Sequence, residues 1–555
     1  MAFRVLMLLL LSCLLAHGIR LGMAQSYDPC ENLTDYQYKP SEQLPHGRRH
    51  FPNGFVFGSA TAAYQVEGAA NTDGRGPSIW DRFAHEFPDR IADWSNGDVA
   101  LDHYRNYPED IQRMKAMNLD AYRFSISWTR IFPHGRMQDG INDAGVQFYH
   151  NLLDMLIENR LEPYVTIWHW DTPQALEAEY GGFLSRNIVK DFKDYCNFLF
   201  SEYGDKVKKW ITLNEPMVHV QRGYDEGLHA PGRCSGRANR KCVAGDSATE
   251  PYIVTHNLLL AHAAAYRLYE EEYKVHDQKG VVGITIVTFW FLPYNPDAIA
   301  DRFAVDRSLD FNYGWYLDPI HYGRYPRSMV DLVGPRLPTF TNQESDMLKK
   351  SYDFIGLNYY TTYYAKNNAE FDPVHLRYTR DSHAITTRTY SQFLAASQMG
   401  STWQYKYPEG LRNLLNYTKN TYDDPDIYIT ENGMGTQEDP EQKLEEAIAD
   451  TMRVEFYNDH LASIYQAIKE EKVKVKGFFA WSYADNYEWN DGYSVRFGLN
   501  YVNYTDLSRH PKHSACWYSH FCRRSEQPKD DNKADKRQHF CRRRSQGSPQ
   551  RCSIR

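Results

Sequence analysis

The sequence lacks several patterns that mark large classes of proteins. After its first residues it has no run of about 20 apolar residues, so no membrane-spanning helix is expected. GAANTDGRG lacks the GxGxxG spacing of a phosphate-binding turn, and neither CxxC pairs nor His-rich spacing suggest a metal site. The formal net charge of −8 argues against a nucleic-acid-binding body, because such domains are usually basic.

The first 24 residues have the composition of a secretory signal peptide. A short basic start precedes the apolar stretch VLMLLLLSCLLA, and small residues follow where a signal peptidase would cut. We therefore expect a protein of the secretory pathway, with residues 25–50 as an N-terminal leader. The chain does not end in a KDEL-type retention signal, and vacuole, cell wall and ER-derived body stay open as destinations.

An oxidising compartment changes how the nine cysteines are interpreted. Cys13 lies in the predicted signal, and Cys234 and Cys242 flank a short basic loop, which predicts a disulfide between them. Sequence alone leaves open how the late cysteines pair: Cys516, Cys522, Cys541 and Cys552. Three N-x-T sequons, at Asn32, Asn416 and Asn503, predict N-glycosylation.

Eight short apolar runs recur along residues 51–521, separated by helix-like stretches. Their Val, Ile, Phe, Tyr and Trp content with little polar alternation is typical of parallel strands buried on both faces. The spacing predicts the α/β class and a single (β/α)8 TIM barrel with long loops at its C-terminal face. An open doubly wound sheet is the alternative, but it should offer a Gly-rich phosphate turn. The runs are FVFGSATAAYQ, AYRFSISW, PYVTIWHW, KWITLNE, VVGITIVTFWF, DFIGLNYY, DIYITENG and VKGFFAWSY.

Residues 522–555 differ in kind from the rest of the chain. They hold eleven Lys and Arg against four Asp and Glu and almost no apolar side chains. This composition predicts a basic, disordered tail. Three interpretations stay open for it: a solvated or cleaved extension, a segment that binds an anionic partner or acts as a nuclear-type signal, and a disulfide-linked assembly arm.

Two carboxylates stand where predicted strands end. Glu215 closes TLNE and Glu431 closes YITE, and a barrel would bring both strand ends to one face. Glycosidic bond cleavage uses one carboxylic acid to protonate the leaving oxygen and one carboxylate facing the anomeric carbon. Either glutamate alone would more often be a salt-bridge partner; the pair together favours catalysis.

Six motifs in order resemble glycoside hydrolase family 1, specifically its plant retaining β-glucosidases. They are FGSATAAYQVEG, RFSISWTRIFP, HWDTPQAL, TLNEP, YITENG and GFFAWSYADNYEW. The resemblance implies that Glu215 is the general acid/base and Glu431 the nucleophile. It also implies that Arg123 supports the nucleophile and that Tyr359, in LNYY, steadies it.

The same resemblance implies a glucose-binding set. A sugar needs amide and carboxylate groups for its hydroxyls and an indole face for its C–H patch. Asn214 would contact the 2-hydroxyl, Trp481 would stack, and Phe497 would line the pocket beside the glucose. The remaining implied contacts are Gln65, His169, Glu488 and Trp489.

The residues expected to contact the aglycone do not all favour the same type of substrate. GLHAPGRCS and VRFGLNYVN are similar to the myrosinases, thioglucosidases in which Gln usually replaces the acid/base that this chain keeps as Glu215. Arg222 occupies the position of the arginine that binds sulfate in that lineage, and a guanidinium suits such an anion. Trp403 resembles the tryptophan that stacks on the aglycone in O-β-glucosidases.

Together these features predict a retaining β-glucosidase that releases O-glucosides of plant secondary metabolites through a glucosyl-enzyme. Cleavage of glucosinolates is the first alternative, and a catalytically inactive sugar-binding barrel is the second. We expect a small-molecule substrate and neither cofactor, metal, nucleic acid nor membrane. The oligomeric state and the natural aglycone cannot be read from the sequence.

Overall fold

The computed structural model describes residues 30, 47–276, 278–370, 372–387, 397–398 and 403–524. The predicted signal, most of the leader with Asn32, and residues 525–555 with Cys541 and Cys552 lie outside them. Within the described part, no helix combines the length and the apolar character needed to cross a membrane.

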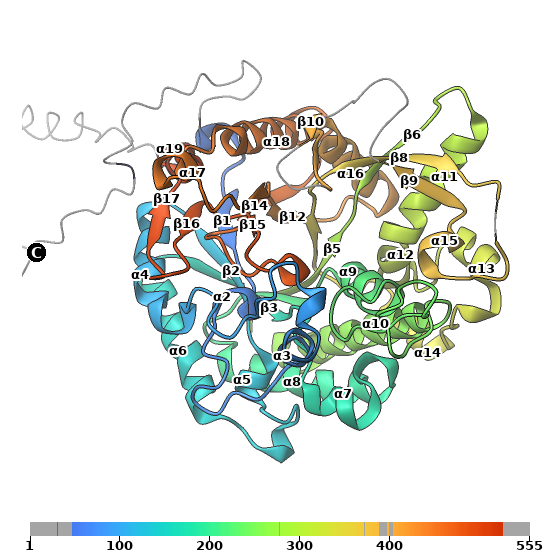
Figure 1. Ribbon diagram of the computed structural model, residues 1–555, viewed down its shortest axis with the longest axis horizontal. Helices are drawn as coiled ribbons and strands as arrows, with labels where there is room; N and C mark the ends of the chain where they lie inside the picture. The colour runs from blue at the N-terminus through green and yellow to red at the C-terminus, as the bar shows by residue number, and fades with distance from the viewer. Residues whose placement is uncertain are drawn as a thin grey trace, which may run out of the picture.

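Eight parallel strands close into a barrel at the centre of the molecule (Figure 1), which confirms the predicted fold and all eight runs. Around the barrel the order is β1-β14-β12-β7-β5-β4-β3-β2. The strands are β1 (Val56–Ala60), β2 (Ala121–Ser125), β3 (Glu162–Trp168), β4 (Lys209–Asn214), β5 (Val281–Val287), β7 (Phe354–Asn358), β12 (Ile427–Asn432) and β14 (Val475–Trp481).

Long helices surround the barrel, and several of them bury an apolar stripe toward its strands. In α8, for example, the stripe comprises Phe192, Tyr195 and Leu199. The long helices are α4 (His103–Ala116), α6 (Asp143–Glu158), α8 (Asn187–Tyr203), α10 (Glu250–Leu268), α11 (Ile299–Leu309), α12 (Trp315–Tyr322), α16 (Pro408–Thr421), α18 (Thr451–Lys469) and α19 (His513–Cys522).

Shorter elements fill the connections. The remaining helices are α2 (Ala63–Val66), α3 (Ile79–Glu86), α5 (Trp128–Ile131), α7 (Gln174–Tyr180), α9 (Pro216–Val220), α13 (Arg327–Val333), α14 (Asn342–Leu348), α15 (Tyr378–Asp381) and α17 (Leu444–Ile448). Outside the barrel, β6 (Trp290–Pro293), β8 (Thr362–Asn367) and β9 (Ala384–Thr387) form one sheet. Three pairs complete the list: β10 (Ser397–Gln398) with β11 (Tyr405–Lys406), β13 (Thr436–Gln437) with β15 (Val495–Arg496), and β16 (Asn500–Val502) with β17 (Arg509–Pro511).

Two disulfides are formed among the described cysteines. Cys234 bonds Cys242, as expected, and Cys30 bonds Cys516, which assigns one of the late cysteines. Cys196 and Cys522 are buried free thiols. The bond from Cys30 to Cys516 fastens part of the leader to α19, so the leader is tied to the last helix of the barrel.

The interior of the barrel is filled by large aromatic rings, and glycines make room for them. Tyr164 packs edge-on against Phe479, with ring centroids 4.7 Å apart. A methyl group on Gly58 of β1 would lie 2.6 Å from the Phe479 ring and 2.7 Å from the carbonyl oxygen of Ala121. Neither neighbour can easily yield, since one is a packed ring and the other is backbone.

We predict that Gly58→Ala lowers the free energy of unfolding by about 1–3 kcal/mol, because it overpacks the barrel interior. Urea denaturation followed by circular dichroism would measure the loss. Gly236→Ala is the matched control, since its added methyl group would meet no atom within 4 Å. Equal stability of the Gly58→Ala protein and the control would contradict the steric argument.

Candidate active site

A cleft of about 620 Å³ opens at the C-terminal end of the barrel. Both predicted catalytic carboxylates, Glu215 and Glu431, line it together with Trp481, Glu488 and Trp489. The cleft lies at this end because the carboxyl ends of eight parallel strands meet there.

Glu215 follows β4 directly and caps α9 in a left-handed backbone conformation with φ of 44°. Such a conformation is strained for a residue with a side chain and is found preferentially at functional sites. The side chain is buried, and the amide nitrogen of Asn358 donates to its Oε1 at 2.6 Å. Burial and, next, the nearby charge of Glu431 raise the pKa of Glu215 well above its usual value. Glu215 is therefore poised to carry a proton.

Glu431 lies in β12 and has a different environment. Arg123 of β2 donates to Oε1 at 2.5 Å, and the hydroxyl of Tyr360 donates to Oε2 at 2.6 Å. Arg123 is fully buried, so its charge acts on the carboxylate at short range and with little solvent screening. A cation and a hydroxyl donor both stabilise the ionised carboxylate, which is the form that a nucleophile requires.

The assignment of Tyr359 as the tyrosine that steadies Glu431 is wrong. Its hydroxyl instead contacts Thr362 and donates to the carbonyl oxygen of Tyr407. Side chains alternate along a strand and its immediate extension. Asn358 ends β7 pointing into the barrel, so Tyr359 points outward and Tyr360 points inward again.

Asn214 and His169 form a polar group beside the two carboxylates. Arg123 donates from its second amine to Asn214 Oδ1 at 2.6 Å, and Asn214 Nδ2 lies 2.9 Å from His169 Nε2. Burial and then the charge of Arg123 lower the pKa of His169 well below its usual value. His169 is therefore neutral and accepts this amide proton at Nε2, leaving Nδ1 to donate elsewhere.

Among the buried polar atoms that have no hydrogen-bond partner in the described part of the chain, two are suited to a ligand in the inner part of the cleft. They are Nδ1 of His169 and Oε1 of Gln65, which belongs to α2. The amide nitrogen of Gln65 is already used by Asn486 Oδ1 at 2.9 Å and the Tyr487 carbonyl at 2.8 Å. Buried polar groups are normally paired, so one donor and one acceptor are held ready for a polar ligand.

Aromatic rings and a further carboxylate complete the inner part of the cleft. Trp481 and Trp489 both stack near His169, with centroid distances of 6.1 and 5.8 Å, and Phe497 also lines the cleft. Burial and then the neighbouring carboxylate of Asp491 raise the pKa of Glu488. Indole faces next to hydrogen-bonding groups have the chemistry that binds a hexose.

The outer part of the cleft contains Trp403 and Arg222. Trp403 meets the ring of Tyr360 edge-on at 5.7 Å. Arg222 is paired with Glu226, with Arg222 Nη1 at 3.3 Å from Glu226 Oε2. An anionic group bound by Arg222 would have to compete with this carboxylate.

The sequence reasoning missed Asn358 and Tyr360. Both stand in the quoted run DFIGLNYY, and the period-two alternation of side chains at a strand end is the signal that could have found them. Within the residues that the structure describes, His, Cys, Asp and Glu side chains form no group of three or more suited to a metal ion.

A closed parallel barrel with paired glutamates at its C-terminal end is the arrangement expected of a glycoside hydrolase. Comparison with known proteins specifies the family. Residues 47–527 match the model of glycosyl hydrolase family 1, so the chain belongs to this family and is a glycoside hydrolase.

Several plant and animal proteins are similar over most of the chain. Beta-glucosidase 12 of Oryza sativa subsp. japonica is 49% identical, covering 87% of this chain and 94% of the relative. Beta-glucosidase 32 of Arabidopsis thaliana is 50% identical, covering 87% and 91%. A solved rice beta-glucosidase is 46% identical with a TM-score of 0.85, covering 86% and 100%. A solved aphid myrosinase is 36% identical with a TM-score of 0.76, covering 85% and 98%.

We predict that Tyr360→Phe lowers kcat/KM for an aryl β-glucoside by about tenfold or more, because a hydrogen bond to a buried carboxylate is lost. Steady-state kinetics on the purified protein would measure this. Tyr359→Phe is the matched control: it also removes a buried hydroxyl, but one that contacts Thr362 and Tyr407. A larger kinetic loss in the Tyr359→Phe control would instead indicate that Tyr359 stabilises Glu431.

Proposed function

We propose that the protein is a retaining β-glucosidase whose natural substrates are O-β-D-glucosides of plant secondary metabolites. The observation that carries the proposal is the unequal environment of the two glutamates. Burial and the Glu431 charge favour a protonated Glu215, whereas Arg123 and Tyr360 stabilise an ionised Glu431. A double displacement requires one protonated carboxylic acid and one ionised carboxylate that acts as the nucleophile.

In the first step Glu431 attacks the anomeric carbon while Glu215 gives its proton to the glycosidic oxygen. The bond to the aglycone breaks, and a covalent glucosyl-enzyme forms on Glu431 with inversion. Glu215, now a carboxylate, takes a proton from water, and the water oxygen replaces Glu431 with a second inversion. The product is β-glucose, and both glutamates return to their starting states.

The glucose itself would be held by the inner part of the cleft. The free acceptor on Gln65 and the free donor on His169 suit sugar hydroxyls, and Asn214 suits the 2-hydroxyl. Trp481 and Phe497 would cover its apolar face, while Glu488 and Trp489 complete the polar side. Trp403 would stack on an aromatic aglycone.

A secretory location is part of the same proposal. Two disulfides suit an oxidising compartment. Asn503 lies in the turn between β16 and β17 and Asn416 on α16, both partly accessible, so both sequons remain candidates for N-glycosylation. Release of a defence-type aglycone in such a compartment would fit the plant relatives.

We predict that Glu215→Gln spares substrates with good leaving groups and cripples those with poor ones. A dinitrophenolate departs without protonation, whereas an alkoxide needs an acid. In the wild type, kcat/KM should fall as the pH rises through the raised pKa of Glu215, because the acid loses its proton. The variant should show no such alkaline limb for the dinitrophenyl glucoside, because neither the leaving group nor the glutamine depends on that proton. Equal losses on both substrate classes would contradict the role of Glu215.

Glu431→Gln serves as the comparison variant and should abolish turnover of both substrate classes. A slow 2-fluoro glucoside should label Glu431 in the wild type, and peptide mass spectrometry would locate the label. Binding of glucose without turnover or labelling would identify an inactive sugar-binding barrel.

Hydrolysis of glucosinolates is the second candidate function, since Arg222 lines the cleft and could meet a sulfate. Its pairing with Glu226 and the presence of Glu215 favour O-glucosides. We predict efficient turnover of an aryl β-glucoside that changes less than about threefold in Arg222→Ala. A matched panel of an aryl glucoside, an alkyl glucoside and a glucosinolate would measure it. Glucosinolate turnover that collapses in Arg222→Ala would support a thioglucosidase instead.

A further inference from the structure

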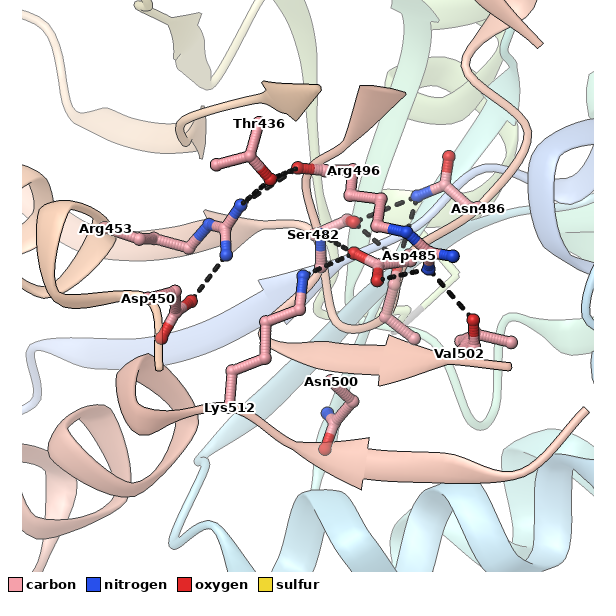
Figure 2. Close-up of polar contacts among 12 residues, drawn as sticks. Thr436, Asp450, Arg453, Ser482, Asp485, Asn486, Arg496, Asn500, Val502 and Lys512 are labelled. Atoms are coloured by element: carbon pink, nitrogen blue, oxygen red, sulfur yellow. Dashed lines mark hydrogen bonds and ion pairs between the residues drawn. The ribbon is translucent and has the colours of Figure 1, made fainter. Parts of the chain in front are cut away.

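A buried network of charged side chains surrounds Asp485 (Figure 2). Its centre is Asp485, which is fully buried and follows β14 by four residues. Arg496 donates to Asp485 Oδ2 at 2.8 Å, and Lys512 donates to Oδ1 at 2.7 Å. None of these three side chains is among those that line the cleft.

The network joins the two ends of one loop. Asp485 stands three residues before Glu488, and Arg496 stands directly before Phe497. The backbone nitrogen of Gly498 also donates to Asp485 Oδ1, at 2.8 Å. The Asp485–Arg496 contact therefore closes the loop on which Glu488 and Trp489 are presented to the cleft.

Lys512 connects this loop to a different part of the chain. It precedes α19, and its backbone nitrogen donates to the carbonyl oxygen of Leu499 at 3.0 Å. Arg496 reaches in the other direction, to the Glu438 carboxylate and to the Val502 carbonyl oxygen at 2.9 Å. Its guanidinium also lies over the rings of Tyr501 and Tyr504. The loop is thus fixed to α19 and to the strand pairs beside it.

The burial of Lys512 is energetically unfavourable by itself. Burial and then the charge of Arg453 lower its pKa to about 8, so at neutral pH the amine still carries its proton beside Asp485. Burial alone would raise the pKa of Asp485. The charges of Lys512 and Arg496 outweigh this effect and hold the pKa of Asp485 below its usual value. Buried ion pairs often add little net stability compared with apolar packing. The effect expected of this network is therefore to hold the loop in one conformation.

We propose that Lys512 is a positioning residue for glucose binding: through Asp485 and Arg496 it fixes the loop that presents Glu488 and Trp489. This inference rests on the proposed function, because glucose is the ligand that the loop would contact. The side chain of Lys512 touches neither substrate nor either catalytic glutamate. Its effect should therefore appear in substrate binding more than in the chemical step.

The test compares Lys512→Met with the wild type on an aryl β-glucoside. We expect KM to rise about tenfold while kcat changes less than about threefold, because the groups around Glu215 and Glu431 keep their contacts. In a Glu488→Gln background the same substitution should raise KM less than about threefold, since the residue it positions is already impaired. An unchanged KM, or effects that simply multiply in the double variant, would overturn the proposal.

Arg48→Met is the matched structural control. Arg48 and Asp120 form another largely buried ion pair, at 2.7 Å, and Asp120 immediately precedes β2 at the opposite end of the barrel. This variant should lower the melting temperature and leave KM unchanged. A KM rise in Arg48→Met equal to that in Lys512→Met would mean that general destabilisation explains both, and would overturn the proposal.

Two further measurements keep the test decisive. If Lys512→Met does not fold, Lys512→Gln carries the same comparison, with a smaller rise in KM and the same non-additivity with Glu488→Gln. Glucose affinity read from tryptophan fluorescence gives the comparison without turnover. A wild type that binds glucose but hydrolyses no glucoside would refute the proposed function alone, and an unaltered glucose affinity in the Lys512 variant would refute the positioning role alone.

Discussion

The arrangement of polar groups in the cleft depends on the contact between Arg123 and Glu431. Arg123 is fully buried, and its two terminal nitrogens contact Glu431 and Asn214 at 2.5 and 2.6 Å. A buried guanidinium would be costly without such partners, so its presence requires strands β2, β4 and β12 to end at one place. Asn214 in turn orients His169 through a hydrogen bond, and the charge of Glu431 contributes to the raised pKa of Glu215. One cation thereby sets the arrangement of the groups from three strands.

The two glutamates differ because of what surrounds them rather than because of what they are. Glu431 receives a cation and a tyrosine hydroxyl, whereas Glu215 receives one neutral amide from Asn358. Both are buried, and two negative charges held close together away from solvent are mutually unfavourable. The proton therefore belongs to the glutamate without the cation. This division of roles follows from a small number of neighbours on adjacent strands.

The sequence predicted the barrel and most of the cleft, because buried parallel strands have a strong local signature. All eight runs became strands, and Glu215 and Glu431 reached the same cleft. The error at Tyr359 arose where two identical residues are adjacent, and only the direction of the strand decides between them.

Long-range contacts of the chain could not be predicted in the same way. Pairing of Cys30 with Cys516 and the network around Asp485 depend on how loops fold over the barrel. No local pattern records these contacts, since each depends on where distant segments meet. Local alternation and motif spacing thus predict the residues at the strand ends but not the contacts between distant loops.

The unpaired atoms of Gln65 and His169 indicate how such a cleft can discriminate between ligands. A buried donor or acceptor without a partner carries a desolvation cost of about 1–3 kcal/mol until a ligand supplies the missing bond. A ligand that lacks the matching hydroxyl leaves that cost in place, so sites built this way reject it far more strongly than an apolar pocket would. The selectivity for the sugar therefore depends on rigid placement of groups whose hydrogen bonds are incomplete in the empty protein. Rigid placement of the loop bearing Glu488 is part of the same requirement, because Gln65 Nε2 donates to Asn486 and Tyr487 at the start of that loop.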